Sequence, residues 1–374
     1  MKKLAIDCRS INKEKTGVGN VLINTLRRLR LENIEITLFF DREVKDNLRE
    51  EFEKNGYYIQ IIKCSNYAIW EQILLPIKIG NKYNYVWFPA NTGSVFVRAN
   101  KIATIHDVIF AKSLKEIPLS GVLSKDLARL YRCIFAKILA KTSKKIYTVS
   151  NYSRNDIISK YTIDSEKVKV IYNGLDTKFI NRESNILKKD YILSFGSNEV
   201  RKNTELMIKV YKELVDNYCE MKDIKLILYG FRGYEKSKIK KMISNLGLEN
   251  KVIVYKYVTD EQLIKLYREA KVFCFLSSFE GFGLPIIESM ASKTPVVALN
   301  NSSVSEIVGD FGILISNNSV KNIANEINKL LCDKDKYKNL IDLGIKNTEK
   351  YNWDISIEDL SNDINQLINR KILD

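Results

Sequence analysis

The chain has 374 residues, 45% of them hydrophobic, which is the composition of a globular protein too long for one ordinary core. Its formal net charge of +15 is uneven, since residues 1–187 carry 32 basic and 19 acidic side chains whereas residues 188–374 carry 28 and 26. No apolar run approaches the roughly 18 residues of a membrane-spanning helix, and six scattered cysteines with a single histidine exclude a convincing zinc site and indicate reduced thiols.

Apolar segments alternate with amphipathic helical segments along the whole chain, a pattern typical of parallel α/β sheets. The chain begins with a strand rather than a signal peptide, because Asp7 ends the first apolar patch, and a cytoplasmic protein is expected. Five strands are predicted in the first half, at residues 3–7, 34–40, 85–89, 101–105 and 144–150. Six are predicted in the second half, at residues 191–196, 224–230, 251–258, 271–277, 295–299 and 312–316.

The polar segment 177–190 shows no clear apolar period and is predicted to link two doubly wound, Rossmann-like domains. The predicted domains are 1–180 and 190–355, with a C-terminal helix over 356–374 that packs back toward the first domain. Ligands of such sheets bind at the carboxyl ends of the strands, so a ligand-binding cleft between the two domains is expected.

The basic excess of the first half is greatest between Arg98 and Lys145, where there are eleven basic residues and three acidic ones. Such a surface favours an anionic partner, which is membrane lipid, nucleic acid or a phosphorylated substrate. A role in solubility alone explains the charge equally well. Composition therefore leaves the partner open.

The most informative motif is FEGFGLPIIESMA at residues 279–291, where an apolar strand turns into a helix. Gly281 and Gly283 permit positive φ and the close approach of a ligand, and the free N–H groups of the helix start attract an anion such as phosphate. Glu280 and Glu288 bracket the turn, and a carboxylate can accept hydrogen bonds from two adjacent hydroxyls of a sugar. From their spacing alone, Glu280 is equally well a surface residue and Glu288 a capping acid.

The longer segment FEGFGLPIIESMASKTPVVA resembles the signature of retaining GT-B glycosyltransferases of family 4, in which an E-x7-E pair flanks a GFGLP-like turn. The resemblance implies that Glu280 contacts the donor sugar and Glu288 the nucleotide ribose, with the diphosphate between them. It assigns the turn itself to donor binding, through Gly281, Phe282, Gly283 and Leu284. Lys293 and Ser305 stand where the family usually has glycine and proline, and both departures are expected to affect turn stability.

The segment LSFGSNEVRKNTELMIKVYKEL resembles the first strand and helix of the donor domain of that family. The resemblance implies that Arg201 and Lys202 neutralise the diphosphate, whose leaving phosphate gains negative charge as the glycosidic bond breaks. Without the companion motif, the same residues are a polar helix start. Many members have an arginine where this chain has Ser197. Glu306, in NSSVSEIVGDFGILI, corresponds to a donor-side residue near the nucleotide.

Two segments of the first half also resemble the family. DCRSINKEKTGVGN matches the opening strand and glycine-rich loop, in which the N–H groups of Gly17 and Gly19 would face the diphosphate, although a lone GxG is also typical of a plain loop. TIHDVIF places the only histidine, His106, at a predicted strand end, where ligands bind in doubly wound sheets. The family has a His-Asp pair there near the donor sugar, so a site role is expected for His106 and a loop-orienting role for Asp107.

Residues 119–141 predict an amphipathic helix with a basic face, independently of the family. The basic face consists of Lys125, Arg129 and Arg132. We expect the opposite apolar stripe to be buried and the basic face to be solvated; the alternative is a basic face that contacts an anionic membrane or the acceptor. The stripe consists of Leu123, Leu127, Leu130, Ile134 and Ile138.

The resemblance as a whole implies a retaining hexosyltransferase that moves a sugar from a nucleotide diphosphate donor to a surface glycan or lipid-linked acceptor, at the inner face of the cytoplasmic membrane. It implies catalytic roles for His106, Lys202 and Glu280. No metal or other cofactor is expected, because Arg201, Lys202 and backbone donors supply the positive charge. Members using mannose- or rhamnose-type donors are the most similar. A glycan phosphorylase, a sugar-nucleotide epimerase, a nucleic-acid-binding protein and a non-catalytic partner subunit are the alternatives, and no nucleic-acid-binding motif supports the third.

Overall fold

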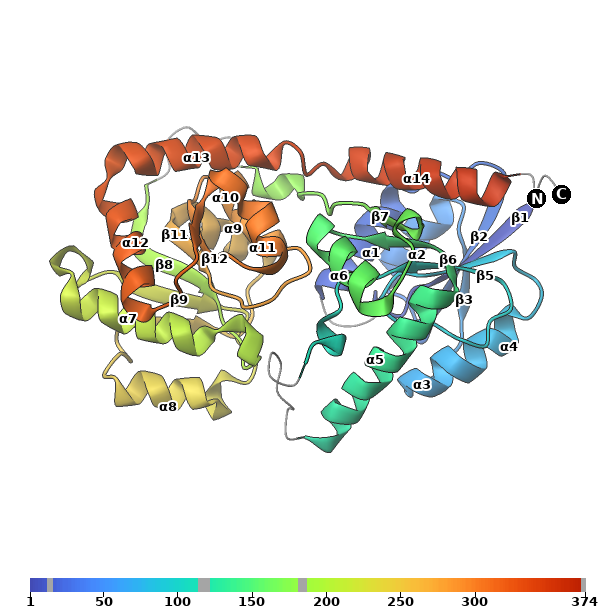
Figure 1. Ribbon diagram of the computed structural model, residues 1–374, viewed down its shortest axis with the longest axis horizontal. Coiled ribbons are helices and arrows are strands. Elements are labelled where there is room, and N and C mark those ends of the chain that lie inside the picture. Colours follow the sequence, from blue (N-terminus) through green and yellow to red (C-terminus); the bar gives the residue numbers. More distant parts are fainter. Residues whose placement is uncertain (12–15, 114–121, 181–186, 371–374) are drawn as a thin grey trace. The chain divides into compact units, whose positions relative to one another are not determined.

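The computed structural model describes residues 1–11, 16–113, 122–180 and 187–370, and its contacts divide the chain into two compact units (Figure 1). Unit 1 comprises Met1–Gly174 and Asn352–Asp374, and unit 2 comprises Leu175–Tyr351. Each unit is a parallel sheet with helices, which confirms the predicted fold class of two α/β domains. The unit boundaries fall at residues 174 and 351, where the sequence suggested 180 and 355.

The sheet of unit 1 has seven strands in the order β3-β2-β1-β4-β5-β6-β7. The five strands predicted for this half are all present, and β3 and β7 are additional. Both additional strands lie at the edges of the sheet and are short, so they lack the continuous apolar run that marks a central parallel strand. The strands are β1 (Lys2–Asp7), β2 (Ile34–Phe40), β3 (Tyr58–Ile61), β4 (Tyr85–Phe88), β5 (Asn100–Thr104), β6 (Ser143–Thr148) and β7 (Val168–Val170).

The helices of unit 1 include the last helix of the chain, α14, which packs against α1. Trp353, Ile357 and Ile364 of α14 are buried in one core cluster with Leu4 and Ile6 of β1. The C-terminal helix is therefore part of the hydrophobic core of unit 1. The helices are α1 (Gly17–Arg28), α2 (Asp46–Lys54), α3 (Tyr67–Ile69), α4 (Leu75–Ile79), α5 (Leu123–Thr142), α6 (Asn151–Tyr161) and α14 (Trp353–Asn369), and a π-helical turn, Trp70–Leu74, joins α3 to α4.

The sheet of unit 2 has six strands in the order β10-β9-β8-β11-β12-β13, and all six were predicted. The central strands β8 and β11 pair with each other, so their carboxyl ends lie side by side. That position is where a doubly wound sheet binds its ligands. The strands are β8 (Lys189–Phe195), β9 (Lys225–Tyr229), β10 (Val252–Tyr255), β11 (Ala270–Phe275), β12 (Val296–Leu299) and β13 (Ile313–Ile315).

Four helices of unit 2, α8, α9, α12 and α13, start after residues whose side chains accept from their first N–H groups. Thr259 and Gln262 form a reciprocal capping box at the start of α9, and Ser319 and Asp333 cap α12 and α13. The helices are α7 (Thr204–Asn217), α8 (Lys238–Asn245), α9 (Asp260–Glu269), α10 (Leu284–Ala291), α11 (Ser302–Val308), α12 (Val320–Cys332) and α13 (Lys334–Thr348). Within the described parts of both units, no helix has the length and apolarity needed to cross a membrane.

The expectation of a buried apolar stripe on α5 is wrong for most of its length. Leu123, Leu127, Leu130 and Ile134 are exposed, and α5 buries instead Ala136, Leu139 and Ala140 near its end. The predicted basic face is also divided. Lys125 is exposed, whereas Arg129 donates to the carbonyl of Lys112 at 2.8 Å and the Arg132 guanidinium lies 4.9 Å from the ring centre of Phe110. The two arginines are therefore held against residues 110–112, and the four apolar side chains remain exposed to solvent.

Candidate active site

The turn that follows β11 is fixed by a glycine and by hydroxyl groups of α11. Gly283 has φ +115°, and a Cβ at this position would lie 2.8 Å from Cδ1 of Ile286, so only glycine fits without strain. The Ser303 hydroxyl donates to the carbonyls of Glu280 and Phe282, and the N–H of Glu280 donates to the hydroxyl of Ser302. Gly281 and Phe282 are buried in this turn. The turn is thus a rigid platform from which Glu280 projects.

Arg201 and Lys202 lie beside Glu280. The sequence assigned the two motifs to donor binding through separate resemblances and did not predict this contact. Nζ of Lys202 is 2.5 Å from one carboxylate oxygen of Glu280, and Nη1 of Arg201 is 2.9 Å from the other. Burial raises the pKa of Glu280, but the two cations outweigh it and hold the pKa below its ordinary value. Burial lowers the pKa of Lys202, against the opposing effect of Glu280. The result is a half-buried group of two cations around one carboxylate.

Hydrogen bonds between two loops bring these residues together. Arg201 and Lys202 belong to a single 3-10 turn that ends at Asn203, whose φ of +51° is left-handed. The Asn203 side chain donates to the carbonyl of Leu276, and the N–H of Ser278 donates to the carbonyl of Arg201 at 2.7 Å. The loop after β8 is thus tied to the loop after β11. Ser197, where many family members have arginine, exchanges hydrogen bonds with Thr204 and so shapes the same loop.

Glu288 lies in the second turn of α10, and its side chain is half-buried. The Tyr267 hydroxyl donates to its Oε2 at 3.2 Å, and the Tyr229 hydroxyl lies 2.6 Å from that of Tyr267. Burial raises the pKa of Glu288 to about 7, with smaller opposing effects from the Tyr267 hydrogen bond and Lys178. A carboxylate with such a pKa changes charge near neutral pH. This is typical of functional positions, although a structural carboxylate can be shifted in the same way.

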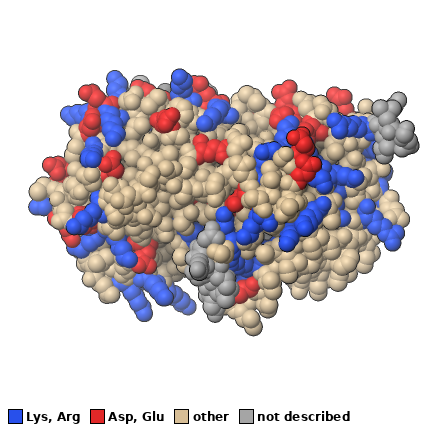
Figure 2. Space-filling model, viewed as in Figure 1, with Lys and Arg blue, Asp and Glu red and all other residues tan. Residues whose placement is uncertain are grey.

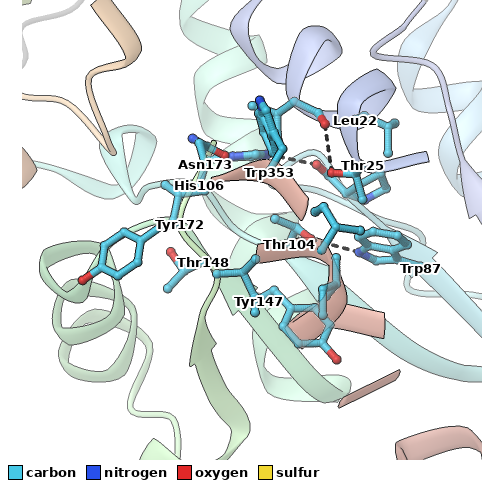
Figure 3. Close-up of a pocket in the computed structure, with 16 residues that line it drawn as sticks. Leu22, Thr25, Trp87, Thr104, His106, Tyr147, Thr148, Tyr172, Asn173 and Trp353 are labelled. Carbon is cyan, nitrogen blue, oxygen red and sulfur yellow. Dashed lines mark hydrogen bonds between the residues drawn. The ribbon is translucent and has the colours of Figure 1, made fainter. Parts of the chain in front are cut away.

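His106 lies at the carboxyl end of β5 in unit 1, and its ring is buried (Figure 3). Its Nε2 is 3.1 Å from the carbonyl of Pro89, which can only accept, so Nε2 carries the proton and Nδ1 is an acceptor in the neutral ring. Burial lowers the pKa of His106, which favours that neutral ring. The next residue, Asp107, accepts from the N–H of Ile109 at 3.0 Å, a contact that orients the loop.

His106 is one of sixteen residues that line a cavity of about 30 Å³ in unit 1, drawn in Figure 3. Trp87 and Thr104 are joined across its wall by a hydrogen bond of 2.9 Å. The Thr148 hydroxyl, also in the wall, is buried and has no hydrogen-bond partner. A cavity of this volume with a polar group in its wall suits a water molecule and is too small for a sugar. The cavity is therefore part of the packing behind His106.

The glycine-rich loop is placed at the start of α1, where Gly17 is the first residue of the helix. The N–H of Gly19 donates to the side chain of Thr16 at 3.1 Å, and a Cβ on Gly19 would lie 2.6 Å from the carbonyl oxygen of Ser10. A Cβ on Gly17 would meet nothing within 4 Å. Gly19 is therefore required by the close approach of the chain to itself, whereas Gly17 has open space beside it.

Other residues that the sequence singled out have local roles. Lys293 has φ +59°, a left-handed conformation that explains why glycine is usual at this position in the family. Ser305 lies inside α11, and its hydroxyl donates to Asn300 at 2.6 Å. Burial lowers the pKa of Lys350, and the half-buried Glu306, on the same helix as Ser305, opposes that shift only in part. Among the described residues, no group of three or more His, Cys, Asp or Glu is placed to hold a metal ion.

The sequence did not single out three further residues of the site. Glu199 accepts from Nε of Arg201 at 2.8 Å, so this arginine lies between two carboxylates. Tyr229 at the end of β9 and Tyr267 in α9 form the hydroxyl pair behind Glu288. Glu199 stands two residues before Arg201, so its proximity could have been proposed. The tyrosines come from different elements, and their pairing depends on the order of the strands.

Comparison with known proteins agrees with this geometry. Residues 176–347 match the family model of glycosyl transferases group 1, and residues 15–179 match that of glycosyltransferase family 4. An N-acetylgalactosamine-N,N'-diacetylbacillosaminyl-diphospho-undecaprenol 4-alpha-N-acetylgalactosaminyltransferase of Campylobacter jejuni is 31% identical over 84% of this chain and 86% of its own length. O-antigen chain mannosyltransferase B of Escherichia coli is 30% identical over 57% of this chain, and the match spans 58% of that relative.

A solved structure, Anabaena HepE in complex with UDP-glucose, superposes with a TM-score of 0.74 at 16% identity, covering 97% of this chain and 99% of that one. At that identity the superposition supports the fold alone. Two Rossmann-like units with a carboxylate pair around a glycine turn define a GT-B glycosyltransferase. The chain belongs to the family 4 glycosyltransferases, and it is an enzyme of the hexosyltransferase class.

Proposed function

We propose that the protein transfers a hexose, with retention of configuration, from a nucleoside diphosphate sugar to a growing surface glycan on a lipid carrier. The observation that carries this proposal is the convergence of Arg201, Lys202 and Glu280 beside the start of α10, with the half-buried Glu288 on the same helix. Cations and a helix start favour a diphosphate, and the two carboxylates suit hydroxyl groups of two sugars.

The proposed reaction breaks the bond between the sugar C1 and the β-phosphate oxygen and forms a bond from C1 to an acceptor hydroxyl oxygen. The acceptor proton goes to the departing phosphate. Arg201 and Lys202 stabilise the negative charge that this phosphate gains, and Glu280 binds hydroxyls of the donor sugar. Glu288 binds the ribose. We propose that no metal ion is required, because the two side-chain cations supply the charge that a metal supplies elsewhere.

His106 is proposed to act on the donor sugar through Nδ1, the ring atom left as an acceptor when Nε2 donates to Pro89.

The proposed acceptor is a lipid-linked glycan, since the Campylobacter relative is named for an undecaprenol diphosphate substrate and the Escherichia relative for the O-antigen chain. A mannose-type donor is the first candidate for the sugar. We place the protein at the cytoplasmic face of the membrane, where its charge of +15 would meet anionic lipid. The two relatives are named as transferases, which disfavours a phosphorylase, an epimerase or a nucleic-acid-binding protein.

The test begins with thermal stability of the pure protein in UDP, GDP, dTDP and ADP, and in their hexose conjugates. A ligand at about 100 times its Kd adds about 2.7 kcal/mol to the free energy of unfolding when it binds only the folded state. We expect one diphosphate to raise Tm selectively. Transfer from the matching sugar conjugate is then measured with and without EDTA, and the product anomer is read by NMR. Loss of transfer in EDTA, or an inverted anomer, would contradict the mechanism.

A further inference from the structure

Two neighbouring helical segments of unit 1 expose large apolar side chains, which we call the apolar ridge. Its first part, on the segment 67–79 that contains α3, the π-helical turn and α4, is Ile69, Ile73 and Ile77; its second part, on α5, is Leu123, Leu127, Leu130 and Ile134. These seven side chains are between 44% and 76% exposed. Exposed apolar surface gathered in one place, unlike single exposed residues, indicates an interaction site.

The exposure follows a helical period rather than poor packing. Ile69, Ile73 and Ile77 are four residues apart, so they share one face of their segment. The other face of the same segment is fully buried, with Trp70 and Ile79 at 0% exposure. The segment is thus a well-packed amphipathic element whose outer face is apolar where a solvated helix would be polar.

A buried polar network holds the two parts of the ridge beside each other. The Tyr131 hydroxyl of α5 donates to Glu71 at 2.6 Å and accepts from Gln72 at 2.9 Å, and its ring packs edge-on against that of Tyr67. Glu71 is fully buried and also accepts from Arg9, at the end of β1. Because a buried ion pair is costly to break, this network fixes the position of α5 on the segment 67–79.

The fully exposed charge on these segments is basic, although the half-buried Asp126 lies on α5 between Leu123 and Leu127. Among the described residues between Tyr67 and Thr142, every charged side chain that is classed as exposed is basic. These are Lys78, Lys82, Arg98, Lys125, Lys137 and Lys141. Figure 2 shows blue side chains bordering a mostly tan surface on this part of unit 1. An apolar strip between lysines and arginines is the pattern of elements that lie in a membrane interface.

We propose that the apolar ridge and its basic border dock unit 1 on an anionic lipid bilayer. The isoleucines and leucines enter the boundary between headgroups and acyl chains, and the lysines contact lipid phosphates. The charge favours lipid over a second copy of the chain, because a self-complementary interface would oppose the same basic residues. This inference deepens the proposed function by naming the surface that meets the membrane. It also assigns the contact with the membrane to the leucines of α5 rather than to the basic face considered from the sequence.

The experiment is flotation of the full chain with vesicles of phosphatidylcholine alone or mixed with phosphatidylglycerol. We expect binding to the mixed vesicles only, weakened by salt, since each basic residue near the surface strengthens binding about fivefold. The double variant Leu127→Gln, Leu130→Gln should bind at least about tenfold more weakly. Its control is Ile355→Gln, an exposed apolar residue on α14. Lys125→Gln with Lys137→Gln should also weaken binding, with Lys241→Gln as its control.

The outcomes distinguish a failure of the proposed docking surface from a failure of the proposed transfer reaction. Equal binding of the ridge variant and the wild type, or no binding to mixed vesicles, would overturn the proposal. So would a concentration-dependent dimer that the double variant abolishes, since the ridge would then join two copies. Nucleoside diphosphate binding is measured on the same samples and should be unchanged in the ridge variants. Conversely, Glu288→Ala should weaken nucleotide binding and keep vesicle binding.

Discussion

The Lys202 ammonium lies 2.5 Å from the Glu280 carboxylate, at the edge of unit 2 where β8 and β11 end. Arg201 holds the other oxygen of that carboxylate at 2.9 Å. The two cations expected to bind a diphosphate are therefore both paired with one carboxylate of the chain itself. A diphosphate that binds here must share these cations with Glu280 or displace it. This relationship has consequences for both turnover and affinity.

Lys202→Ala should lower kcat by about 10²–10³-fold, because it removes a preorganised charge from the departing phosphate. Steady-state transfer with saturating donor is the measurement. Lys209→Ala is the matched control, since this lysine lies on the same stretch of chain but is half exposed and pairs with Glu205 of its own helix. A kcat within about twofold of the wild-type value would remove Lys202 from the phosphate site.

Glu280→Gln should abolish most transfer and yet tighten the binding of the free nucleoside diphosphate. The amide no longer pairs as an anion with Arg201 and Lys202, so the diphosphate does not compete with a Glu280 carboxylate for these cations, while the contact to the donor sugar is lost. Calorimetric titration of the variant with the diphosphate measures the first effect and a transfer assay the second. Weaker diphosphate binding would indicate that Glu280 orients the cations rather than competing for them.

Gly283→Ala should destabilise unit 2 by about 1–3 kcal/mol, because φ of +115° strains any side chain and the new Cβ would lie 2.8 Å from Ile286. Denaturant unfolding measures the change. Gly17→Ala serves as the control, since a Cβ there meets nothing within 4 Å. If both variants unfold at the same denaturant concentration as the wild type, the turn does not require its glycine.

Apolar segments that alternate with amphipathic helical segments were sufficient to predict the central strands of both sheets. It could not identify β3 and β7, because short edge strands bury little surface. Motif spacing placed Glu280 and Glu288 around the turn and Arg201 and Lys202 after β8. These cations pair with Glu280 because β8 and β11 are neighbours in the sheet. The order of strands in a sheet cannot be read from residue spacing along the chain. The same limit applies to Tyr229 and Tyr267 behind Glu288.

The stripe on α5 shows where periodicity misleads. A period of 3.6 residues identifies an apolar face but does not say what covers it. Leu127 and Leu130 would have been buried if α5 packed along its whole length, but the helix packs chiefly near its end, through Leu139 and its neighbours.

Glu288 should make the protein less stable as the pH rises. Its pKa is about 7 in the folded chain and 4.5 by reference, so between these values the folded state holds a proton that the unfolded state has lost. The free energy of unfolding then falls with pH across that window, by up to about 3 kcal/mol above pH 7, and is unaffected below pH 4.5. Glu288→Gln should therefore be more stable than the wild type at alkaline pH and similar in acid, with the exposed Glu220→Gln as the control. Parallel Tm curves for Glu288→Gln and wild type would contradict the shift.

Nucleotide affinity should instead increase with pH, because the ionised Glu288 accepts hydrogen bonds from the ribose hydroxyls and the protonated acid accepts fewer. We expect the Kd for the nucleoside diphosphate to fall as pH rises through about 7, and Glu288→Ala to be weaker and independent of pH. Tyr267→Phe removes a hydrogen bond that lowers the pKa of Glu288, so its binding curve should move to higher pH. Tyr229→Phe should move it less, since Tyr229 donates to Tyr267 and not to Glu288. A Tyr267→Phe curve that coincides with the wild-type curve would show that Glu288 does not bind the ribose as a carboxylate oriented by Tyr267.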